Sequence, residues 1–320
     1  MPRQTGRRTF IRESIATSAA GALALTASSS GAAPASPTPA EALPQGKIGK
    51  LSVSRLLLGG NLLTHYTHSR DLRYVYALAA KYNTDEKILE TLALAEANGI
   101  NTLSVHTVPH TLDLLKQHRK RGGKIQWIIC PTAPVNPGVK EYAEQVKQLV
   151  DMGTDAIYLW GVHADRLVGQ GKAELIGEAV EAARKHGLPS GVGGHDLRVV
   201  EACERLKVPN DFYIKTLHHH KYPSGPKPEE IKGPYQEDPG YWCSDPEAVI
   251  ERMKTVEKPW IAFKVMAAGA ISPTSGFKFV LEGGADFVLA GMFDFEIRDD
   301  MMVMKSLLAR ELKRQRPWRA

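Results

Sequence analysis

The feature that most constrains the fold is an alternation of short apolar runs with amphipathic helical patterns, repeated about eight times between residues 54 and 290. The runs are continuous and rich in β-branched and aromatic residues, as expected of strands that are buried on both faces. We expect strands at Ser54–Leu58, Thr102–His106, Ile125–Cys130, Ala156–Val162, Ser190–Gly194, Phe212–Leu217, Trp260–Val265 and Asp286–Ala290. Eight evenly spaced β–α units predict an α/β fold, a (β/α)8 TIM barrel. A doubly wound sheet is the alternative, but it would not need eight such units.

The helical segments and the connections indicate one barrel domain over residues 48–315. Asn83 with Glu86 can cap a helix that Gly99 closes, and Asp245 followed by Pro246 can begin another. The one long interruption, residues 218–244, is rich in proline, glycine and charged residues and carries aromatic residues near its end. A loop of this length is typical of an active-site cover, and a disordered surface insertion is the alternative.

The first forty residues have the pattern of a targeting segment. Arg7 and Arg8 precede Phe10 and Ile11, a weakly apolar stretch follows, and Ala/Ser/Pro-rich sequence comes after it. This order is typical of a secretory signal, and the paired arginines resemble a twin-arginine export signal. We expect residues 1–40 to be signal peptide and low-complexity linker, recognised by the twin-arginine export machinery. The mature protein would then be periplasmic or otherwise exported, with no stable membrane insertion after cleavage.

Charge and cysteine content narrow the range of partners. The formal net charge is +6, and half of it comes from residues 1–40, which hold four arginines and one glutamate. Without a basic stripe interleaved with aromatic residues, nucleic-acid binding is not expected, and a small molecule is the expected partner. The three cysteines show no C-x-x-C spacing, so no disulfide framework is predicted.

Histidines are the most informative residues of the mature chain. Nine of the eleven follow predicted strands, and in a (β/α)8 barrel such positions open onto the C-terminal face, where barrel enzymes assemble their sites. Neutral imidazole is a common ligand of transition metals and a common general base. We expect a divalent transition metal, zinc or similar, and the predicted ligands are His106, His163, His195 and His218.

Other residues at the same face are candidates for catalysis and substrate binding. Lys264 lies within an apolar run, so its ammonium must point into the barrel mouth or be paired, because isolated burial of the charge is prohibitive. The predicted catalytic residues are His163, Lys264 and Asp294. The predicted substrate-binding residues are Asn61, His65, Tyr241 and Trp242. The two aromatic residues would form a wall of the substrate site if the loop folds over the mouth.

Several motifs resemble the aldo/keto reductase superfamily over about residues 50–305. They include the opening strand ending in Gly59-Gly60 and the helix-to-strand junction around Gly99-Ile100-Asn101. The strand from Asp155 toward His163 and the segment around Ile261–Gly269 are also similar. The resemblance implies an aldo/keto reductase-like (β/α)8 barrel.

The catalytic and cofactor residues that the resemblance implies are largely absent. The family aspartate falls on Ser104, no lysine is in register near Cys130, the tyrosine has no counterpart, and His163 alone matches. The segment that would bind the cofactor phosphate contains Asp294 and Glu296, which repel an anion. NADPH is therefore not expected as a cofactor, and no cofactor-binding residues are predicted.

Three functions stay open at this point. The first is a metal-dependent non-redox enzyme, an isomerase, lyase or hydrolase, acting on a small polyhydroxy or carbonyl compound such as a sugar derivative. The second is a divergent NADPH-dependent aldo/keto reductase that uses His163 and a replacement acid. The third is a non-catalytic exported binding protein that keeps the barrel and the aromatic loop. The resemblance in fold does not decide between them.

Overall fold

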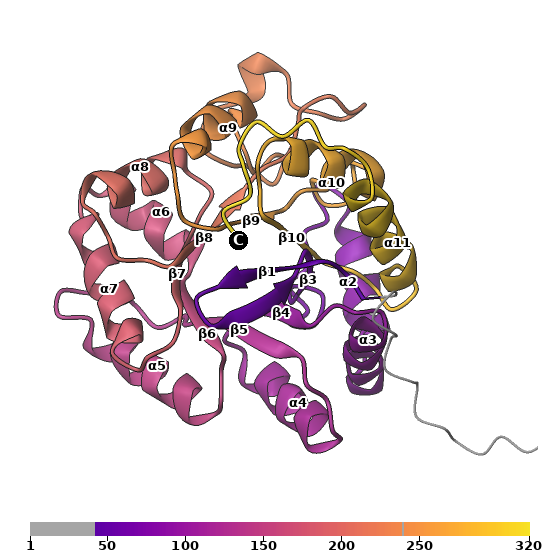
Figure 1. Ribbon diagram of the computed structural model, residues 1–320, viewed down its shortest axis with the longest axis horizontal. Coiled ribbons are helices and arrows are strands. Elements are labelled where there is room, and N and C mark those ends of the chain that lie inside the picture. Colours follow the sequence, from indigo (N-terminus) through magenta and orange to yellow (C-terminus); the bar gives the residue numbers. More distant parts are fainter. Residues whose placement is uncertain (1–41, 239) are drawn as a thin grey trace, which may run out of the picture. The chain divides into compact units, whose positions relative to one another are not determined.

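The computed structural model describes residues 42–238 and 240–320, and the predicted export signal lies outside them. Eight parallel strands form a closed barrel in the order β10-β3-β4-β5-β6-β7-β8-β9 (Figure 1). Their bounds are β3 Leu56–Gly59, β4 Thr102–His106, β5 Gln126–Cys130, β6 Ala156–Leu159, β7 Ser190–Gly194, β8 Phe212–Thr216, β9 Trp260–Phe263 and β10 Phe287–Ala290. The predicted (β/α)8 barrel is confirmed.

Helices surround the barrel and connect its strands (Figure 1). Their bounds are α2 Arg73–Tyr82, α3 Asp85–Ala97, α4 Pro109–Lys120, α5 Lys140–Asp151, α6 Gly161–Gly169, α7 Glu174–Arg184, α8 Leu197–Arg205, α9 Pro246–Lys254, α10 Pro273–Glu282 and α11 Ile297–Leu308. The Asp245 carboxylate caps α9 by accepting the Ala248 N–H at 2.9 Å, as expected. The cap of α3 is Thr84 rather than Asn83, because Asn83 ends α2, a helix that the sequence patterns did not predict.

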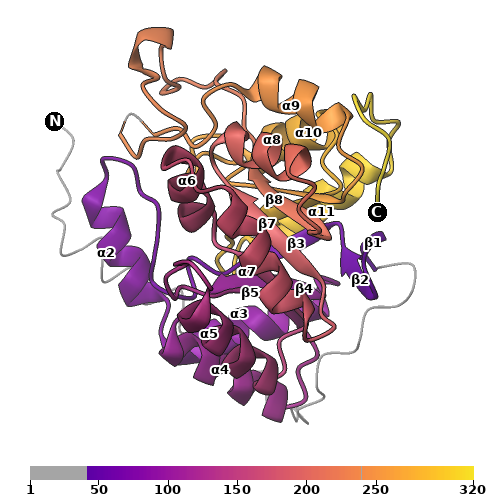
Figure 2. The same ribbon diagram turned by 90° about the vertical axis from the view of Figure 1, so that its left-hand side faces the viewer.

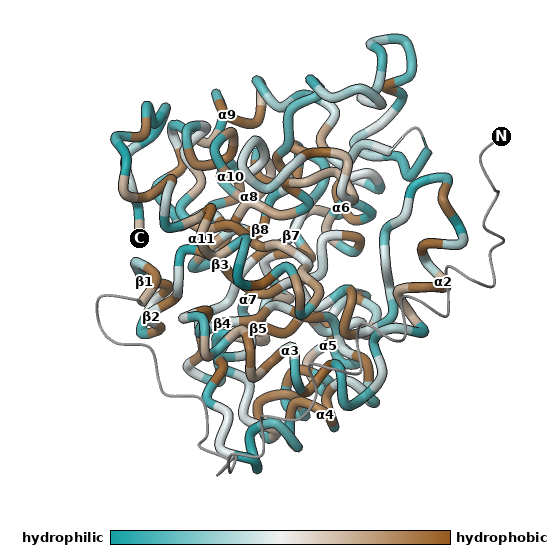
Figure 3. The backbone as a smooth tube through the Cα atoms, turned by 90° about the vertical axis from the view of Figure 1, so that its right-hand side faces the viewer, coloured by the Kyte–Doolittle hydropathy of each residue, from teal (hydrophilic) through white to brown (hydrophobic). Residues whose placement is uncertain are grey.

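The core has two layers, one on each side of the strands. A large apolar cluster fills the space between the strands and the helices, and a smaller one fills the barrel interior. In Figure 3 the hydrophobic residues are concentrated at the strands, and the residues of the outlying turns are hydrophilic. Among described residues, no helix is long and apolar enough to cross a membrane. The three cysteines are buried, and none of them forms a disulfide in the structure.

An antiparallel hairpin and the C-terminal segment close the N-terminal end of the barrel, here called the barrel base. Strands β1 Gln45–Ile48 and β2 Leu51–Ser54 form the hairpin, and Ile48 and Val53 pack into the interior cluster. Figure 2 shows the hairpin at one end, and α2 with the loop after β8 toward the other. Asp286 and Arg316 form a fully buried ion pair at 2.7 Å. The Arg316 guanidinium also donates to backbone carbonyls of residues 256, 258 and 284.

Candidate active site

The C-terminal end of the strands is here called the barrel mouth. Its first feature is a tight turn from β6 into α6, which depends on close backbone contacts. The run predicted as a strand over residues 156–162 ends at Leu159, and α6 begins at once at Gly161. A Cβ at Gly193 on β7 would lie 2.9 Å from the Gly161 nitrogen, so this tight strand-to-helix turn depends on glycine. The turn brings Asp165, one turn into α6, beside the end of β7.

Asp165 holds His195, the residue that follows β7. Its carboxylate accepts a 2.7 Å hydrogen bond from His195 Nδ1 and two more from the backbone N–H groups of His195 and Asp196. Since a carboxylate only accepts here, Nδ1 carries the proton and Nε2 keeps its lone pair. Among described residues, the His195 ring makes a hydrogen bond through Nδ1 only, so Nε2 has no partner. His195 is thus oriented as a base or a ligand.

A second histidine–carboxylate pair lies next to Lys264. Glu237, from the loop of residues 218–244 that we call the mouth loop, accepts from His68 Nδ1 at 2.5 Å. On its other side, His68 Nε2 is in close hydrogen-bond contact with Lys264 Nζ. The Lys264 ammonium also lies 5.2 Å from the centre of the Trp242 ring. Three segments distant in sequence therefore meet at one lysine.

Rings from six strand ends surround these groups. His195 contacts Tyr235 at 4.4 Å and Phe263 at 5.4 Å between ring centres, and Trp242 contacts His68 at 5.2 Å. The belt continues through Tyr66, His106 and Trp160. Tyr66 and Tyr235 are exposed, so solvent reaches the edge of the belt. Flat apolar walls with a few polar groups between them are typical of small-molecule sites.

Burial dominates the electrostatics of the mouth. Desolvation lowers the pKa of Lys264 to about 7, against the raising effect of the Glu237 and Asp165 carboxylates. Burial likewise lowers the pKa of His195 to about 4, although the Asp165 hydrogen bond opposes it. Desolvation also lowers the pKa of His68 and of His106. At neutral pH His195 is therefore neutral, and Lys264 titrates.

The structure places four predicted site residues at the mouth. Lys264 and His195 lie among the polar groups just described, and His106 stacks on Trp160 with 6.3 Å between ring centres. The Trp242 ring lies beside Lys264, and its role in substrate binding stays a prediction.

Asn61 lies half-buried where the chain leaves β3. Its backbone carbonyl accepts from the Tyr66 N–H at 2.9 Å, so it shapes the turn that carries Tyr66.

The structure does not bring His163 and His218 together with the polar groups just described, and both ring nitrogens of each are already bonded. His163 lies in α6, donates from Nε2 to the Thr132 carbonyl at 3.2 Å and accepts from Arg166 at 3.3 Å. His218 donates from Nδ1 to the His219 carbonyl at 3.0 Å and accepts the Trp242 N–H at Nε2 at 2.9 Å. His218 fixes the mouth loop rather than facing the site.

Three further predicted site residues, His65, Tyr241 and Asp294, make structural contacts outside the polar groups of the mouth. His65 binds the Asn83 carbonyl at 2.7 Å and so anchors the loop after β3. Tyr241 is fully buried, and its hydroxyl accepts the Lys232 N–H at 3.0 Å inside the mouth loop. Asp294 accepts from the Tyr82 hydroxyl at 2.6 Å and from Lys87 at 3.0 Å, which ties the segment after β10 to α2 and α3.

The predicted metal-ligand set does not form. Within the described part of the chain, no group of three or more His, Cys, Asp or Glu side chains is arranged to hold a metal ion. With His163 and His218 fully bonded, only His106 and His195 of the predicted four keep a free ring nitrogen at the mouth. The residues present therefore do not fit a metal centre, and we derive no step through one.

Sequence reasoning missed two residues that the structure brings into focus. Glu237 lies in a loop whose composition gave no positional signal. Lys215, on β8, is buried and donates to the His195 carbonyl, the Thr216 carbonyl and the Thr216 hydroxyl at 2.8–3.1 Å. A lysine inside an apolar strand run, like Lys264, was the signal that could have identified Lys215.

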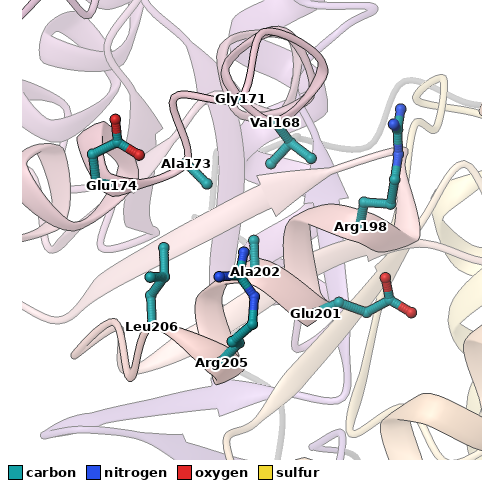
Figure 4. A pocket seen from close by; sticks show the side chains of 9 residues that line it. All are labelled: Val168, Gly171, Ala173, Glu174, Arg198, Glu201, Ala202, Arg205 and Leu206. Atoms are coloured by element: carbon teal, nitrogen blue, oxygen red, sulfur yellow. The ribbon is translucent and has the colours of Figure 1, made fainter.

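Two hollows lie elsewhere on the molecule, and among described residues neither is lined by a histidine–carboxylate pair like those of the mouth. One, of about 390 Å³, lies between α8 and the segment that joins α6 to α7, and Figure 4 shows its lining. Its Arg198 is already paired with Asp196 at 2.5 Å. The other, of about 360 Å³, lies beside His219 and the N-terminal part of α9. The mouth is therefore the candidate active site.

Comparison with known proteins places the fold. No protein-family model matches the chain, and no curated protein matches it either. Among solved structures, two from Pseudomonas aeruginosa, each titled as a putative aldo-keto reductase, are similar. One is 18% identical with a TM-score of 0.55, covering 83% of this chain and 94% of that chain. The other is 15% identical with a TM-score of 0.56, covering 82% and 95%.

This chain has an aldo/keto reductase-like (β/α)8 fold. A truncated 3-deoxy-D-arabino-heptulosonate 7-phosphate synthase from Thermotoga maritima is also similar, at 10% identity and a TM-score of 0.52, covering 84% of this chain and 93% of that chain. At these identities the likeness concerns the fold, and function must be argued from the site.

Proposed function

We propose that this chain is a non-redox enzyme that moves a proton on a small carbonyl or polyhydroxy compound, as isomerases and lyases do. The observation that carries the proposal is the His195–Asp165 pair, buried at the mouth with Nε2 unpartnered among described residues. The His195 ring and the Lys264 amine both lie beside the Phe263 ring. A base oriented by a carboxylate, with a cationic group nearby, is what proton abstraction next to a carbonyl requires.

Each group has a distinct role in this proposal. Asp165 fixes the His195 tautomer so that Nε2 accepts the substrate proton. Lys264 stabilises the negative charge that develops on the carbonyl oxygen, and the partly desolvated mouth strengthens that interaction. Tyr235 and Phe263 flank the His195 ring and supply apolar contact area for the carbon skeleton.

We also propose that the enzyme acts outside the cytoplasm. The support is the twin-arginine pattern in residues 1–40, which no structural observation bears on.

A nicotinamide-dependent reductase is the second candidate, and the likeness in fold to proteins named as aldo-keto reductases favours it. The candidate requires dinucleotide binding, whereas Asp294 and Glu296 follow β10, where the resemblance to aldo/keto reductases implies a basic phosphate site. A fluorescence titration with NADPH separates the two candidates. The non-redox proposal predicts no dissociation constant at or below about 1 μM, which corresponds to roughly −8 kcal/mol.

The test of the proposal is exchange of carbon-bound hydrogen with solvent. The protein is incubated in D2O with small hydroxyaldehydes and hydroxyketones, and deuterium at the carbon next to the carbonyl is followed by NMR. We expect exchange, and a rate about 10²–10⁴-fold lower for His195→Asn and Asp165→Asn. Asp196→Asn is the matched control, because it changes a neighbouring carboxylate that pairs with Arg198. Exchange that is absent, or equal in His195→Asn and wild type, overturns the proposal.

A further inference from the structure

The contacts of Lys264 differ from those of an ordinary buried cation. Among described residues, no carboxylate lies within 4.0 Å of its Nζ, and the polar partner is His68 Nε2. Aromatic faces supply the rest, with Trp242 at 5.2 Å and Phe263 at 6.0 Å from Nζ to ring centre. A lysine in such surroundings is poised to lose its proton.

Backbone geometry turns this side chain into the mouth. In β9 Ile261 belongs to the interior cluster and Ala262 to the outer one, so alternation would send the Lys264 side chain outward, away from the interior. Instead Lys264 adopts φ +57°, followed by Ala267 at +46° and Ala268 at +54°. A left-handed conformation at a lysine is unfavourable, and such strain concentrates at functional sites. Here it delivers Nζ to His68.

His68 and Glu237 complete a three-membered chain. Glu237 accepts a hydrogen bond from His68 Nδ1 at 2.5 Å, so the lone pair of His68 Nε2 is directed at Lys264. Nucleophile, base and orienting carboxylate within hydrogen-bond reach form the arrangement that activates nucleophiles in unrelated enzymes. The mouth therefore has two histidine–carboxylate pairs, one on Lys264 and one at His195.

We propose that Lys264 is a nucleophile that forms an imine with the carbonyl carbon of an aldehyde or ketone substrate, with His68 as its base and Glu237 as the residue that positions His68. This inference rests on the proposed function, because it names the substrate class and the covalent step of the same site. In this inference Lys264 no longer stabilises the negative charge through space. Instead, the imine that it forms accepts the electron pair released by C–H deprotonation.

The step balances without an oxidant or reductant. His68 Nε2 takes a proton from the Lys264 ammonium, and the free amine attacks the carbonyl carbon, forming a C–N bond while the C=O π electrons move to oxygen. Two protons, one returned by His68 and one from the attacking nitrogen, convert that oxygen into water, which leaves. Loss of that water leaves an iminium whose nitrogen keeps its remaining hydrogen, and this iminium accepts the electron pair released when His195 removes the adjacent C–H proton, which gives an enamine. Return of a proton from His195 to an enamine carbon restores an iminium, and water then hydrolyses it to the Lys264 ammonium and the carbonyl product.

Reductive trapping tests the covalent step. The full chain is incubated with dihydroxyacetone or glyceraldehyde and sodium cyanoborohydride, then digested and analysed by mass spectrometry. We expect an adduct on Lys264 whose added mass is that of the probe less one oxygen atom, formed faster than at any other lysine. Lys264→Arg keeps the positive charge and should lose that adduct, and the buried Lys215 in the same digest is the internal control.

The positioning role of Glu237 has its own readout. Glu237→Gln and His68→Gln should slow trapping at neutral pH, and the deficit should shrink as the pH approaches about 10, where lysine loses its proton unaided. A merely structural role would give a deficit independent of pH. A pH-independent deficit, or none, removes these two residues from the proposal.

Trapping and deuterium exchange together separate the two proposals. Exchange that depends on His195, without an adduct at Lys264, overturns the imine and leaves the proposed function standing. An adduct at Lys264 without exchange supports the imine and overturns the proposed proton transfer. Absence of both overturns both, provided that the variants show the circular dichroism of the wild type.

Discussion

The two ends of the barrel bury charge in opposite ways. At the base, Arg316 and Asp286 are fully buried, 2.7 Å apart, and the guanidinium also reaches several backbone carbonyls. At the mouth, Lys264 meets an imidazole nitrogen and aromatic faces, with no carboxylate in contact among described residues. Burial alone therefore does not distinguish a structural charge from a reactive one. What distinguishes them is whether an opposite charge and hydrogen bonds stabilise the charged form. Without these partners, burial shifts the pKa so that the neutral form is favoured.

The largest effect should come from breaking the pair at the base. Arg316→Met leaves Asp286 buried with Arg314 3.9 Å away, and should lower the free energy of unfolding by about 3–5 kcal/mol. Urea denaturation measures it. Arg319→Met is the control, since Arg319 pairs with exposed Glu257 at 3.7 Å, and should change stability by about 1 kcal/mol or less. The comparison fails if the folded Arg316 variant also loses deuterium exchange, because the ion pair at the barrel base would then be needed for catalysis.

Two buried lysines, Lys215 on β8 and Lys264 directly after β9, allow the same comparison between a structural charge and a reactive one. Lys215→Met removes the donor to three oxygens and should cost roughly 1–3 kcal/mol in the free energy of unfolding. Lys264→Met removes an ammonium that burial disfavours, so the melting temperature should be unchanged or higher while turnover is lost. Calorimetry at pH 7 measures both variants. Equal destabilisation by the two substitutions would show that Lys264 is a structural cation.

Acidification should loosen the mouth before the base. Burial lowers the pKa of His195 and of His218 to about 4, below the ordinary value of about 6.5. The unfolded chain therefore binds more protons, and stability falls as the pH drops from about 6.5 toward 4, by roughly 2–3 kcal/mol per histidine. Hydrogen exchange should rise in the mouth loop, where His218 accepts the Trp242 N–H, and stay unchanged in the hairpin. In His218→Gln the pH dependence should weaken, and an equal rise in the hairpin would contradict this view.

The sequence predicted the barrel because its strands are apolar on both faces, and two strands, Thr102–His106 and Ser190–Gly194, were located to the residue. It failed where the chain turns within an apolar run. Residues 156–162 read as one strand, yet Trp160 leads directly into α6, because Gly161 and Gly193 allow a close backbone approach. As a result His163 lies on a helix with its nitrogens bonded, whereas strand-end counting had placed it in the site.

The contacts between residues across the mouth could not be predicted from the sequence either. Lys264 was identified from its place in an apolar run, but its partner His68 is 196 residues away in sequence. Glu237 lies in a loop with no periodicity, so neither its direction nor its contact with His68 follows from local patterns. Propensity and spacing specify which end of a strand a residue occupies. They do not specify which rotamer or which loop conformation completes a site.

The mouth loop has a consequence for the timing of any reaction at Lys264. Because Glu237 belongs to the loop and His68 to the segment after β3, any displacement of the loop that widens the entrance also separates the carboxylate from the imidazole. Under the proposed mechanism, opening of the loop and reactivity of Lys264 would then be mutually exclusive in time. Stray aldehydes that diffuse in while the entrance is wide would meet a lysine without its organised base, and the same motion would discharge product from a site that has already lost its reactivity.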